Sequence, residues 1–332
     1  MVDNLAGMKD RPAGVDERAL RDALEKWGIG AVSLEYAPVG FGDYHWIAAD
    51  ADGPRWFVTV ADLAQKGQAG DGESALRRAM DTAVALRGQG LDFVVAPLAD
   101  AGGETLQLLG SRHAVSVFPL VSGRPGEFGD RLTADERRKT VEMLAELHRT
   151  PPPASTPVRP LRVPMRGRLE EAIEASGGGV WRGGPYAEPA RALVADSAGR
   201  LRERLAEFDR RVDEASGADL VVTHGEPHPG NLVMVEGSPV LVDWDTVGLA
   251  PPERDLWLVA GGPDDLARYA ELTGRRPDPE VMELFRLRWA IEDVALYVED
   301  LRSPHELSAD TREAWEALTD TVRELTAPVS NS

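Results

Sequence analysis

Two short segments in the second half of the chain combine residue types that could hold a metal ion beside a phosphate. The first is His224-Gly225-Glu226-Pro227-His228-Pro229-Gly230-Asn231, and the second is Val242-Asp243-Trp244-Asp245. Phosphoryl transfer needs oxygen ligands for Mg²⁺ and a carboxylate that orients the acceptor hydroxyl, with little other covalent help from the protein. We therefore expect Asn231 and Asp243 to be metal ligands and Glu226 to face the acceptor.

The two histidines of the first segment allow a different metal chemistry. His224 and His228 stand four residues apart, which on a helix could bind zinc. Pro227 and Pro229 prevent a regular helix here, so the spacing argues against a zinc site. We expect His224 to serve the catalytic site by orienting the loop backbone. Asp245 is open to two interpretations, a second metal contact or a turn residue.

The elements that must position these segments change in character near residue 120. Before it, a helix is predicted over 16–27 and another over 73–87, with strands over 32–39, 44–49, 55–60, 93–97, 106–109 and 114–118. After it, a capping-box pattern at 133–136 opens a helix, a proline-rich connector covers 151–164, and helices are predicted over 189–216, 264–273, 279–301 and 310–325. Strands are expected there only over 220–223, 232–235 and 240–243. This predicts an α+β chain with a β-rich lobe over 1–120 and a helical lobe over 121–332.

The two chemical segments carry a family resemblance. His-Gly-Glu-Pro-His-Pro-Gly-Asn resembles the catalytic loop of aminoglycoside phosphotransferases and the related choline-kinase-like enzymes, and Val-Asp-Trp-Asp resembles the metal-binding segment after it. The resemblance implies a protein-kinase-like bilobal fold that binds ATP or GTP with Mg²⁺. It makes Glu226 the catalytic base and makes Asn231 and Asp243 the magnesium ligands. Pro252-Glu253-Arg254-Asp255-Leu256 resembles the helix start that buttresses the site in that family.

The resemblance also implies a nucleotide site in the first lobe. Gly40 and Gly42 stand between the first two predicted strands, where the phosphate-covering glycine loop belongs. Phe118 and Leu120 stand where the lobes join and where an adenine would hydrogen-bond to the backbone. An ordinary hairpin turn and a plain lobe connector are the alternative readings of these two segments.

Three positions depart from the family pattern. The loop carboxylate is Glu226 where the family has aspartate, which keeps the charge and lengthens the reach by one methylene. Thr59 stands where the third strand should carry a phosphate-binding lysine, and Arg77 stands where the next helix should carry that lysine's glutamate partner. Arginine suits phosphate, so Arg77 or Arg78 could supply the missing charge, and Lys66 is a further candidate. A non-catalytic pseudokinase is the competing hypothesis.

The acceptor is expected beside a helix of the second lobe. Glu292 and Asp293 could contact an amine of a sugar-like or aminocyclitol acceptor, or could belong to a solvated acidic face. The formal net charge of −19 favours a cationic small molecule and disfavours nucleic acid or an anionic membrane as partner. An aminoglycoside-like antibiotic and a metabolite such as an amino sugar or a choline-like alcohol both fit these residues.

Length and composition add general limits. At 332 residues the chain suits one large domain or two lobes, and it holds no apolar stretch of about 18 residues that could span a membrane. Its N-terminus carries no apolar signal-peptide core. The absence of cysteine excludes disulfides and thiolate metal sites, so we expect a cytoplasmic protein.

Overall fold

The computed structural model describes residues 9–327 except 13, 41, 65, 67–70, 216 and 218. The chain forms two compact units, one made of Asp3–Arg159 with Asp219–Pro277 and the other of Pro160–Ala218 with Asp278–Ser332. The first unit contains the predicted sheet together with both chemical segments. This division does not coincide with the lobe boundary that the sequence predicts near residue 120, which stays a prediction.

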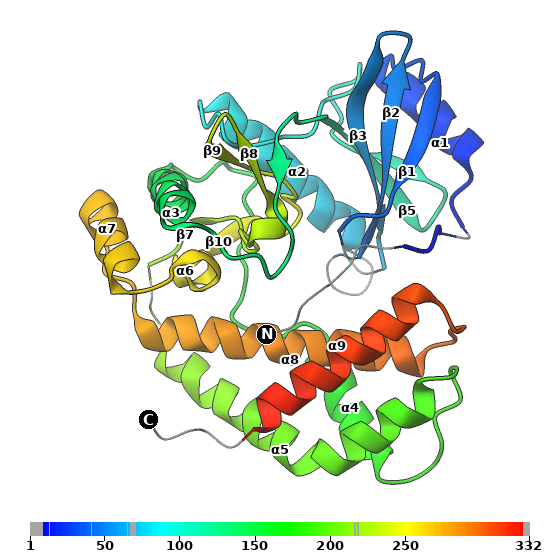
Figure 1. Cartoon of the computed structure of the whole chain (residues 1–332), viewed down its shortest axis with the longest axis vertical. Helices are drawn as coiled ribbons and strands as arrows, with labels where there is room; N and C mark the ends of the chain where they lie inside the picture. The colour runs from blue at the N-terminus through cyan, green and yellow to red at the C-terminus, as the bar shows by residue number, and fades with distance from the viewer. Residues whose placement is uncertain are drawn as a thin grey trace. The chain divides into compact units, whose positions relative to one another are not determined.

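An antiparallel five-stranded sheet forms the N-terminal part of the first unit (Figure 1). Its strands, in the spatial order β1-β2-β3-β5-β4, are β1 Ser33–Ala37, β2 Asp43–Asp50, β3 Gly53–Asp62, β5 His113–Pro119 and β4 Gln107–Leu109. The strands predicted over 32–39, 44–49 and 55–60 are confirmed, and they form an antiparallel meander of β1, β2 and β3. The strand predicted over 93–97 is wrong, because Val94 makes only an isolated bridge to Leu241.

Alternation along the strands separates the two faces of this sheet. Val58 and Val60 of β3 are buried together with Leu20 and Leu24 of helix α1, Glu17–Leu24. Because successive strand residues point to opposite faces, Thr59 lies on the face away from α1. It is paired across the sheet with His45 of β2. The core thus occupies one face and leaves polar residues on the other.

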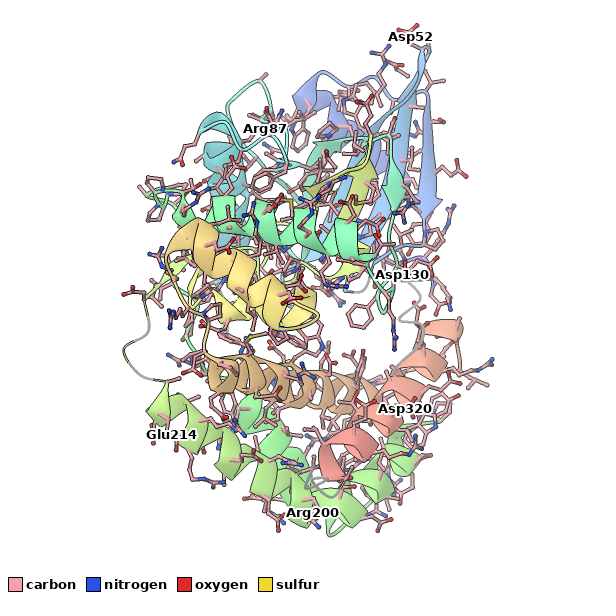
Figure 2. The ribbon with its side chains drawn as sticks, turned by 60° about the vertical axis from the view of Figure 1, so that its left-hand side comes forward. Asp52, Arg87, Asp130, Arg200, Glu214 and Asp320 are labelled. Carbon is pink, nitrogen blue, oxygen red and sulfur yellow. The ribbon has the colours of Figure 1, made fainter. Side chains whose placement is uncertain are left out.

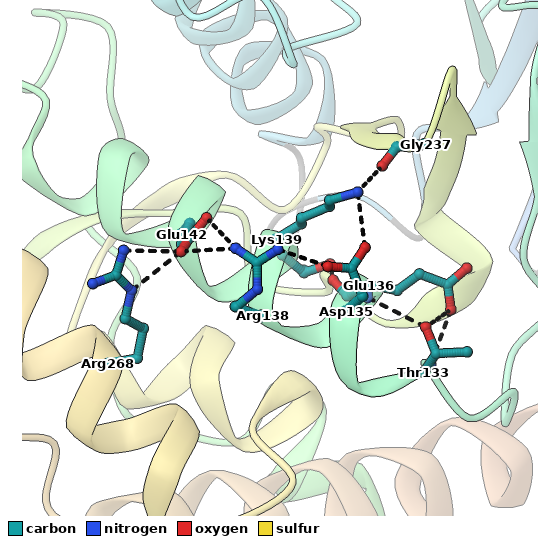
Figure 3. A network of polar contacts seen from close by, with 9 residues as sticks. Thr133, Asp135, Glu136, Arg138, Lys139, Glu142, Gly237 and Arg268 are labelled. Carbon is teal, nitrogen blue, oxygen red and sulfur yellow. Dashed lines mark hydrogen bonds and ion pairs between the residues drawn. The ribbon is translucent and has the colours of Figure 1, made fainter.

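Helix α3, Ala134–Arg149, follows the sheet and begins at the predicted capping box, which is confirmed (Figure 3). Thr133 and Glu136 satisfy each other's backbone amides there, as orphan donors of a first turn require. Lys139 of α3 donates to the carbonyl of Gly237 at 2.7 Å and pairs with Asp135 at 2.8 Å (Figure 3). The contact with Gly237 ties the turn between β8, Leu232–Val235, and β9, Ser238–Leu241, to α3.

Short strands and helices build the rest of the first unit. They are α2 Gly72–Gly88, β6 Arg124–Pro125, β7 Val221–Thr223, η2 Pro229–Asn231, β8 Leu232–Val235, β9 Ser238–Leu241, β10 Gly248–Ala250, α6 Glu253–Val259 and α7 Pro263–Thr273. Strand β7 pairs with β10, and β8 pairs with both β6 and β9. β6 and β10 were not predicted, since two or three residues are too few to display an alternation.

The second unit is helical. It consists of α4 Arg166–Ser176, α5 Ala187–Glu214, α8 Pro279–Arg302 and α9 Ala309–Thr326, of which α4 was not predicted. α8 contacts the other three helices. Charged residues such as Arg200, Glu214 and Asp320 lie on the outer surfaces of α5 and α9 (Figure 2). Within the described part of the chain, no helix combines the length and apolarity that crossing a membrane requires.

The packing of α1 on the sheet generates a stability prediction. Leu24 has no exposed surface, whereas Leu108 of β4 is about half exposed. We expect Leu24→Ala to lower the free energy of unfolding by about 2–5 kcal/mol because it leaves a cavity. Leu108→Ala, the matched control, should cost about 0.5 kcal/mol or less. Urea unfolding followed by circular dichroism measures both, and equal costs would contradict the assigned core.

Candidate active site

The first chemical segment, His224 to Asn231, is held in place by one buried carboxylate. Asp255, in the first turn of α6, accepts hydrogen bonds from the amides of His224 at 2.8 Å and Gly225 at 2.6 Å. His148 of α3 contacts the same carboxylate at 3.0 Å through Nε2 and the Tyr269 hydroxyl at 2.9 Å through Nδ1. Burial by itself raises the pKa of the Asp255 carboxyl. The hydrogen bond with His148 and the charges of His148 and Arg254 lower it by a larger amount, so the pKa of Asp255 is below its ordinary value.

Arg254 supports the same loop from the preceding position of α6. Its guanidinium donates to the Thr223 hydroxyl at 2.9 Å and to the Thr246 carbonyl at 3.0 Å. Gly225 has a φ of 104°, and a Cβ there would overlap the Arg254 guanidinium. Glycine is therefore required both by the backbone conformation and by the close approach. These contacts confirm that the α6 start buttresses the site.

His224 links the two chemical segments. Its buried ring contacts the Val242 carbonyl at 2.9 Å through Nε2, and Nδ1 accepts from the Glu226 amide at 3.3 Å. This pair of partners places the ring proton on Nε2. Burial lowers the pKa of His224, which keeps the ring neutral. The side chain thus orients backbone, as expected.

Asn231 and Glu226 are brought together by the turn of η2. The Asn231 amide nitrogen donates to the Glu226 carbonyl at 2.9 Å, which leaves the amide oxygen as an acceptor. His228 packs edge-on against Phe128 with ring centroids 4.8 Å apart, and burial lowers its pKa to about 3. The two histidines therefore belong to different packing contacts.

Asp243 follows β9 in a left-handed conformation, with a φ of 63°. Such a conformation in a residue other than glycine is typical of functional sites. Burial, followed by the charge of Asp245, raises the pKa of the Asp243 carboxyl well above its ordinary value. Glu226 acts in the same direction. The site thus concentrates negative charge that a bound cation would stabilise.

Lys66, on the segment between β3 and α2, enters this group of carboxylates. Its ammonium lies 2.6 Å from Asp245 Oδ2 and 3.0 Å from Asp43 Oδ1, the latter an ion pair rather than a directed hydrogen bond. Burial alone would lower the pKa of Lys66, but Asp245, Asp43 and Asp243 raise it well above its ordinary value. The backbone carbonyl of Asp245 also accepts a hydrogen bond from the Arg159 guanidinium at 2.8 Å.

The residues predicted for the nucleotide lie around the sheet. Gly40 and Gly42 flank the turn before β2 with φ values of 72° and 92°, and Phe41 between them lies outside the described residues. Phe118 is on β5 opposite Phe57. The amide of Leu120 already donates to the Arg55 carbonyl at 2.9 Å. The assignment of these positions to adenine and phosphate stays a prediction.

Arg77 lies on α2 with its guanidinium paired to two carboxylates. It contacts Glu73 at 3.1 Å and Glu104 of the loop before β4. Arg78 donates to the Ser74 hydroxyl on the exposed side of the same helix. The structure therefore brings Lys66, and neither arginine, into contact with Asp245.

Glu292 and Asp293 lie on α8, in the second compact unit. Glu292 pairs with Arg288 one turn earlier at 3.0 Å. The charge of Asp293 acts on the buried phenol of Tyr297, whose pKa is raised chiefly by burial. Their role toward an acceptor stays a prediction.

Sequence reasoning missed Asp43, Arg159 and His148. All three reach the site from segments far away in the chain. Asp43 directly follows the glycine segment at Gly40 and Gly42 but was given no role, and no motif marks Arg159 or His148. For Lys66 a signal was present, because the chain contains four lysines, at positions 9, 26, 66 and 139. Lysine is rare in this chain, and Lys66 stands shortly after the strand that lacks the expected lysine. This combination indicates that Lys66 could replace the missing charge.

The antiparallel sheet, the buttressed loop and the carboxylates around it define a small-molecule phosphotransferase with a kinase-like fold. The chain belongs to the phosphotransferase enzyme family, whose sequence profile matches residues 40–285. It is also 29% identical over 303 residues to protein StrN of Streptomyces griseus, covering 86% of this chain and 85% of StrN.

Solved structures share the fold at low sequence identity. Spectinomycin phosphotransferase APH(9)-Ia in complex with ADP and spectinomycin superposes with a TM-score of 0.70 at 16% identity, covering 94% of this chain and 98% of that one. The amicoumacin kinase hAmiN, in complex with AMP-PNP, Ca²⁺ and Ami, superposes with a TM-score of 0.62 at 12% identity, covering 94% and 93%. The pattern of Leu249-Ala250-Pro251-Pro252-Glu253-Arg254-Asp255-Leu256 looks most similar to spectinomycin phosphotransferase, and that resemblance is confirmed at the level of fold.

The role of Asp255 generates a prediction on stability and pH. We expect Asp255→Asn to lower the free energy of unfolding at pH 7 by about 2–4 kcal/mol, because an amide group then faces buried N–H donors. Since folding lowers the pKa of Asp255, its stabilisation is complete above the unfolded value of about 3.9 and is lost as the pH falls toward the lower folded value.

Denaturant unfolding of the wild type and the variant between pH 7 and pH 3 measures this difference. It should shrink below about pH 4. Asp52→Asn, at an exposed carboxylate paired with Arg55, is the matched control and should change stability by about 0.5 kcal/mol or less. A difference that stays constant with pH would contradict the assigned role.

Proposed function

We propose that this protein transfers the γ-phosphoryl group of ATP or GTP, with Mg²⁺, to a hydroxyl of a small cationic molecule. The observation that carries the proposal is the arrangement of Glu226, Asn231 and Asp243 beside Asp245 on one buttressed loop and hairpin. Nucleotides in the complexes of the similar folds, and Ca²⁺ in one of them, support the choice of cofactors.

The donor set suits magnesium. The Asn231 amide is oriented by the Glu226 carbonyl so that its oxygen can coordinate, and the Asp243 carboxyl would supply a second oxygen. Among the described residues, no three His, Asp or Glu side chains form a metal site by themselves. Mg²⁺ commonly takes one or two protein carboxylates and completes its shell with phosphates and water. When bound, it would neutralise charge on the phosphates.

Glu226 is the residue for the acceptor. It follows the β7 strand on a loop whose amides are fixed by Asp255 and His224, so its carboxylate projects from a rigid support. The carboxylate would accept a hydrogen bond from the acceptor hydroxyl and take its proton as the oxygen attacks phosphorus. Glutamate reaches one methylene further than the aspartate of the family, which leaves room for the acceptor oxygen slightly farther from the loop.

The acceptor class follows from charge. The chain carries a formal net charge of −19, which attracts cations and repels anions. Glu292 and Asp293 are the carboxylates proposed to bind its amine, with Glu292 exchanging its partner Arg288 for the substrate. Aminocyclitol and aminoglycoside antibiotics and amino-sugar or choline-like metabolites share this chemistry, and a panel of acceptors distinguishes them.

Nucleotide binding and turnover test the proposal. Calorimetry with ATP and GTP, with and without Mg²⁺, should show binding that depends on magnesium. Glu226→Gln should lower kcat for acceptor-stimulated ADP release about 10²–10⁴-fold, while nucleotide affinity changes little, because the general base acts only on the acceptor. Asp243→Asn should abolish both turnover and magnesium dependence.

Glu35→Gln, at an exposed carboxylate of β1, is the control and should leave all these quantities unchanged. Wild-type protein that binds no nucleotide at millimolar concentration would contradict the proposal and leave a pseudokinase. Binding without ADP release on any acceptor would leave a nucleotide-binding protein.

The acceptor carboxylates generate a separate prediction. We expect Asp293→Asn and Glu292→Gln each to raise the KM for an amine-bearing acceptor about tenfold, because a charged hydrogen bond contributes about 1.5–3 kcal/mol. The KM for ATP should stay within about twofold, since these residues serve the acceptor. Steady-state kinetics measures both, with Glu283→Gln, an exposed glutamate of the same helix, as control. An equal rise in both KM values would contradict the assignment.

A further inference from the structure

The proposed nucleotide site lacks a cation on the strand that should supply it. Thr59 of β3 lies on the sheet face away from α1, where its hydroxyl contacts His45 Nδ1 at 3.2 Å. His45 in turn stacks on Phe57 with ring centroids 4.9 Å apart. Burial lowers the pKa of His45 to about 4, so this ring is neutral and cannot replace the charge. A polyphosphate on this face would need a positive group from elsewhere.

Lys66 brings a positive group to the same face. Asp43 and His45 are two residues apart on β2, so both point to the side on which Thr59 lies. The Lys66 ammonium pairs with Asp43 at 3.0 Å, and its charge acts on His45. It therefore lies on the same face of the sheet as Thr59, and it also contacts Asp245, two residues after the proposed metal ligand Asp243.

Described residues near Lys66 in the chain, Asp62 and Gly72, contribute to its position. Asp62 caps the end of β3 by accepting from the Ala64 amide at 3.0 Å and pairs with Arg112 at 2.5 Å. Gly72, the first residue of α2, packs so closely on the carbonyls of Leu63 and Lys66 that a Cβ would overlap both. The position of Lys66 thus depends on close backbone packing as well as on its ion pairs.

The chain uses lysine sparingly, and the other lysines serve elsewhere. Lys9 and Lys26 are exposed, and Lys139 ties α3 to the β8–β9 turn. The Lys66 side chain is only 18% exposed. Burying an ammonium costs free energy unless carboxylates or a bound anion compensate it. Three carboxylates around one ammonium leave a negative excess, which a bound Mg²⁺ would offset.

We propose that Lys66, delivered by the segment after β3, binds the α- and β-phosphates of the nucleotide in place of the lysine that Thr59 replaces. Asp43 positions Lys66 through their ion pair, as the glutamate of the following helix is expected to position the strand lysine in the family. Arg77 does not serve this purpose, because Glu73 and Glu104 hold its guanidinium on α2. This inference rests on the proposed function.

Binding of ATP, ADP and adenosine to the magnesium-loaded protein tests it by calorimetry, with adenosine measured by competition. Lys66→Met should weaken ATP and ADP about tenfold to hundredfold, as expected for lost charge-assisted hydrogen bonds, and leave adenosine within about twofold. Arg77→Met is the matched control and should leave all three ligands within about twofold.

Two results would overturn the inference while leaving the proposed function intact. One is ATP affinity in Lys66→Met that equals that of Arg77→Met. The other is an equal loss of adenosine and ATP affinity, which would make Lys66 a structural counter-ion of the carboxylates. Failure of the wild type to bind any nucleotide would instead contradict the proposed function itself.

A measurement on the wild type covers the case in which Lys66→Met does not fold. An ATP analogue with an acyl group on its terminal phosphate acylates a lysine beside the phosphates: the amine attacks the acyl carbonyl, an amide forms, and ATP leaves with loss of the amine proton. Mass spectrometry should find the acyl group on Lys66, and an excess of ATP should prevent this labelling. Protected labelling at another lysine, or at none, would refute the assignment.

Discussion

The buried carboxylate of Asp255 is the constraint on which the site depends. It accepts hydrogen bonds from the amides of His224 and Gly225 and contacts His148, so one negative charge joins α6, α3 and the first chemical segment. A loop that turns this sharply leaves backbone donors without partners, and an unsatisfied buried donor is costly. Because the His224 ring then contacts the Val242 carbonyl, the same carboxylate also sets the second chemical segment.

A second constraint is charge. Asp43, Asp243 and Asp245 lie within electrostatic reach of one another, and burial raises the pKa of Asp43 to about 6. Carboxylates gathered in this way repel one another unless cations stand between them. Lys66 supplies one cation from the chain, and magnesium would supply the rest. Phosphoryl transfer depends mainly on positioning and charge neutralisation, so a site built in this way suits the family's chemistry.

Local signals predicted most of the fold. The capping box at Thr133, the turns of the β1–β2–β3 meander and the apolar periodicity of α5, α8 and α9 act within a few residues and appear as expected. The segment 93–97 reads as a strand because it is apolar, yet its hydrogen bonds go to Leu241 and form no ladder. The short strands β6 and β10 exist only through partners distant in sequence, which periodicity cannot reveal.

The sequence by itself determined the types of the main elements, the candidate roles of Glu226, Asn231 and Asp243, and the absence of a lysine at Thr59. The candidate roles follow from residue types and spacing in two short segments, and the missing lysine follows from comparing β3 with the family pattern. Only the tertiary structure decided which cation meets the carboxylates, because that depends on where the segment after β3 folds. Lys66 and Asp245 are 179 positions apart, and the pairing of β2 with β3 and the close packing of Gly72 bring them to 2.6 Å.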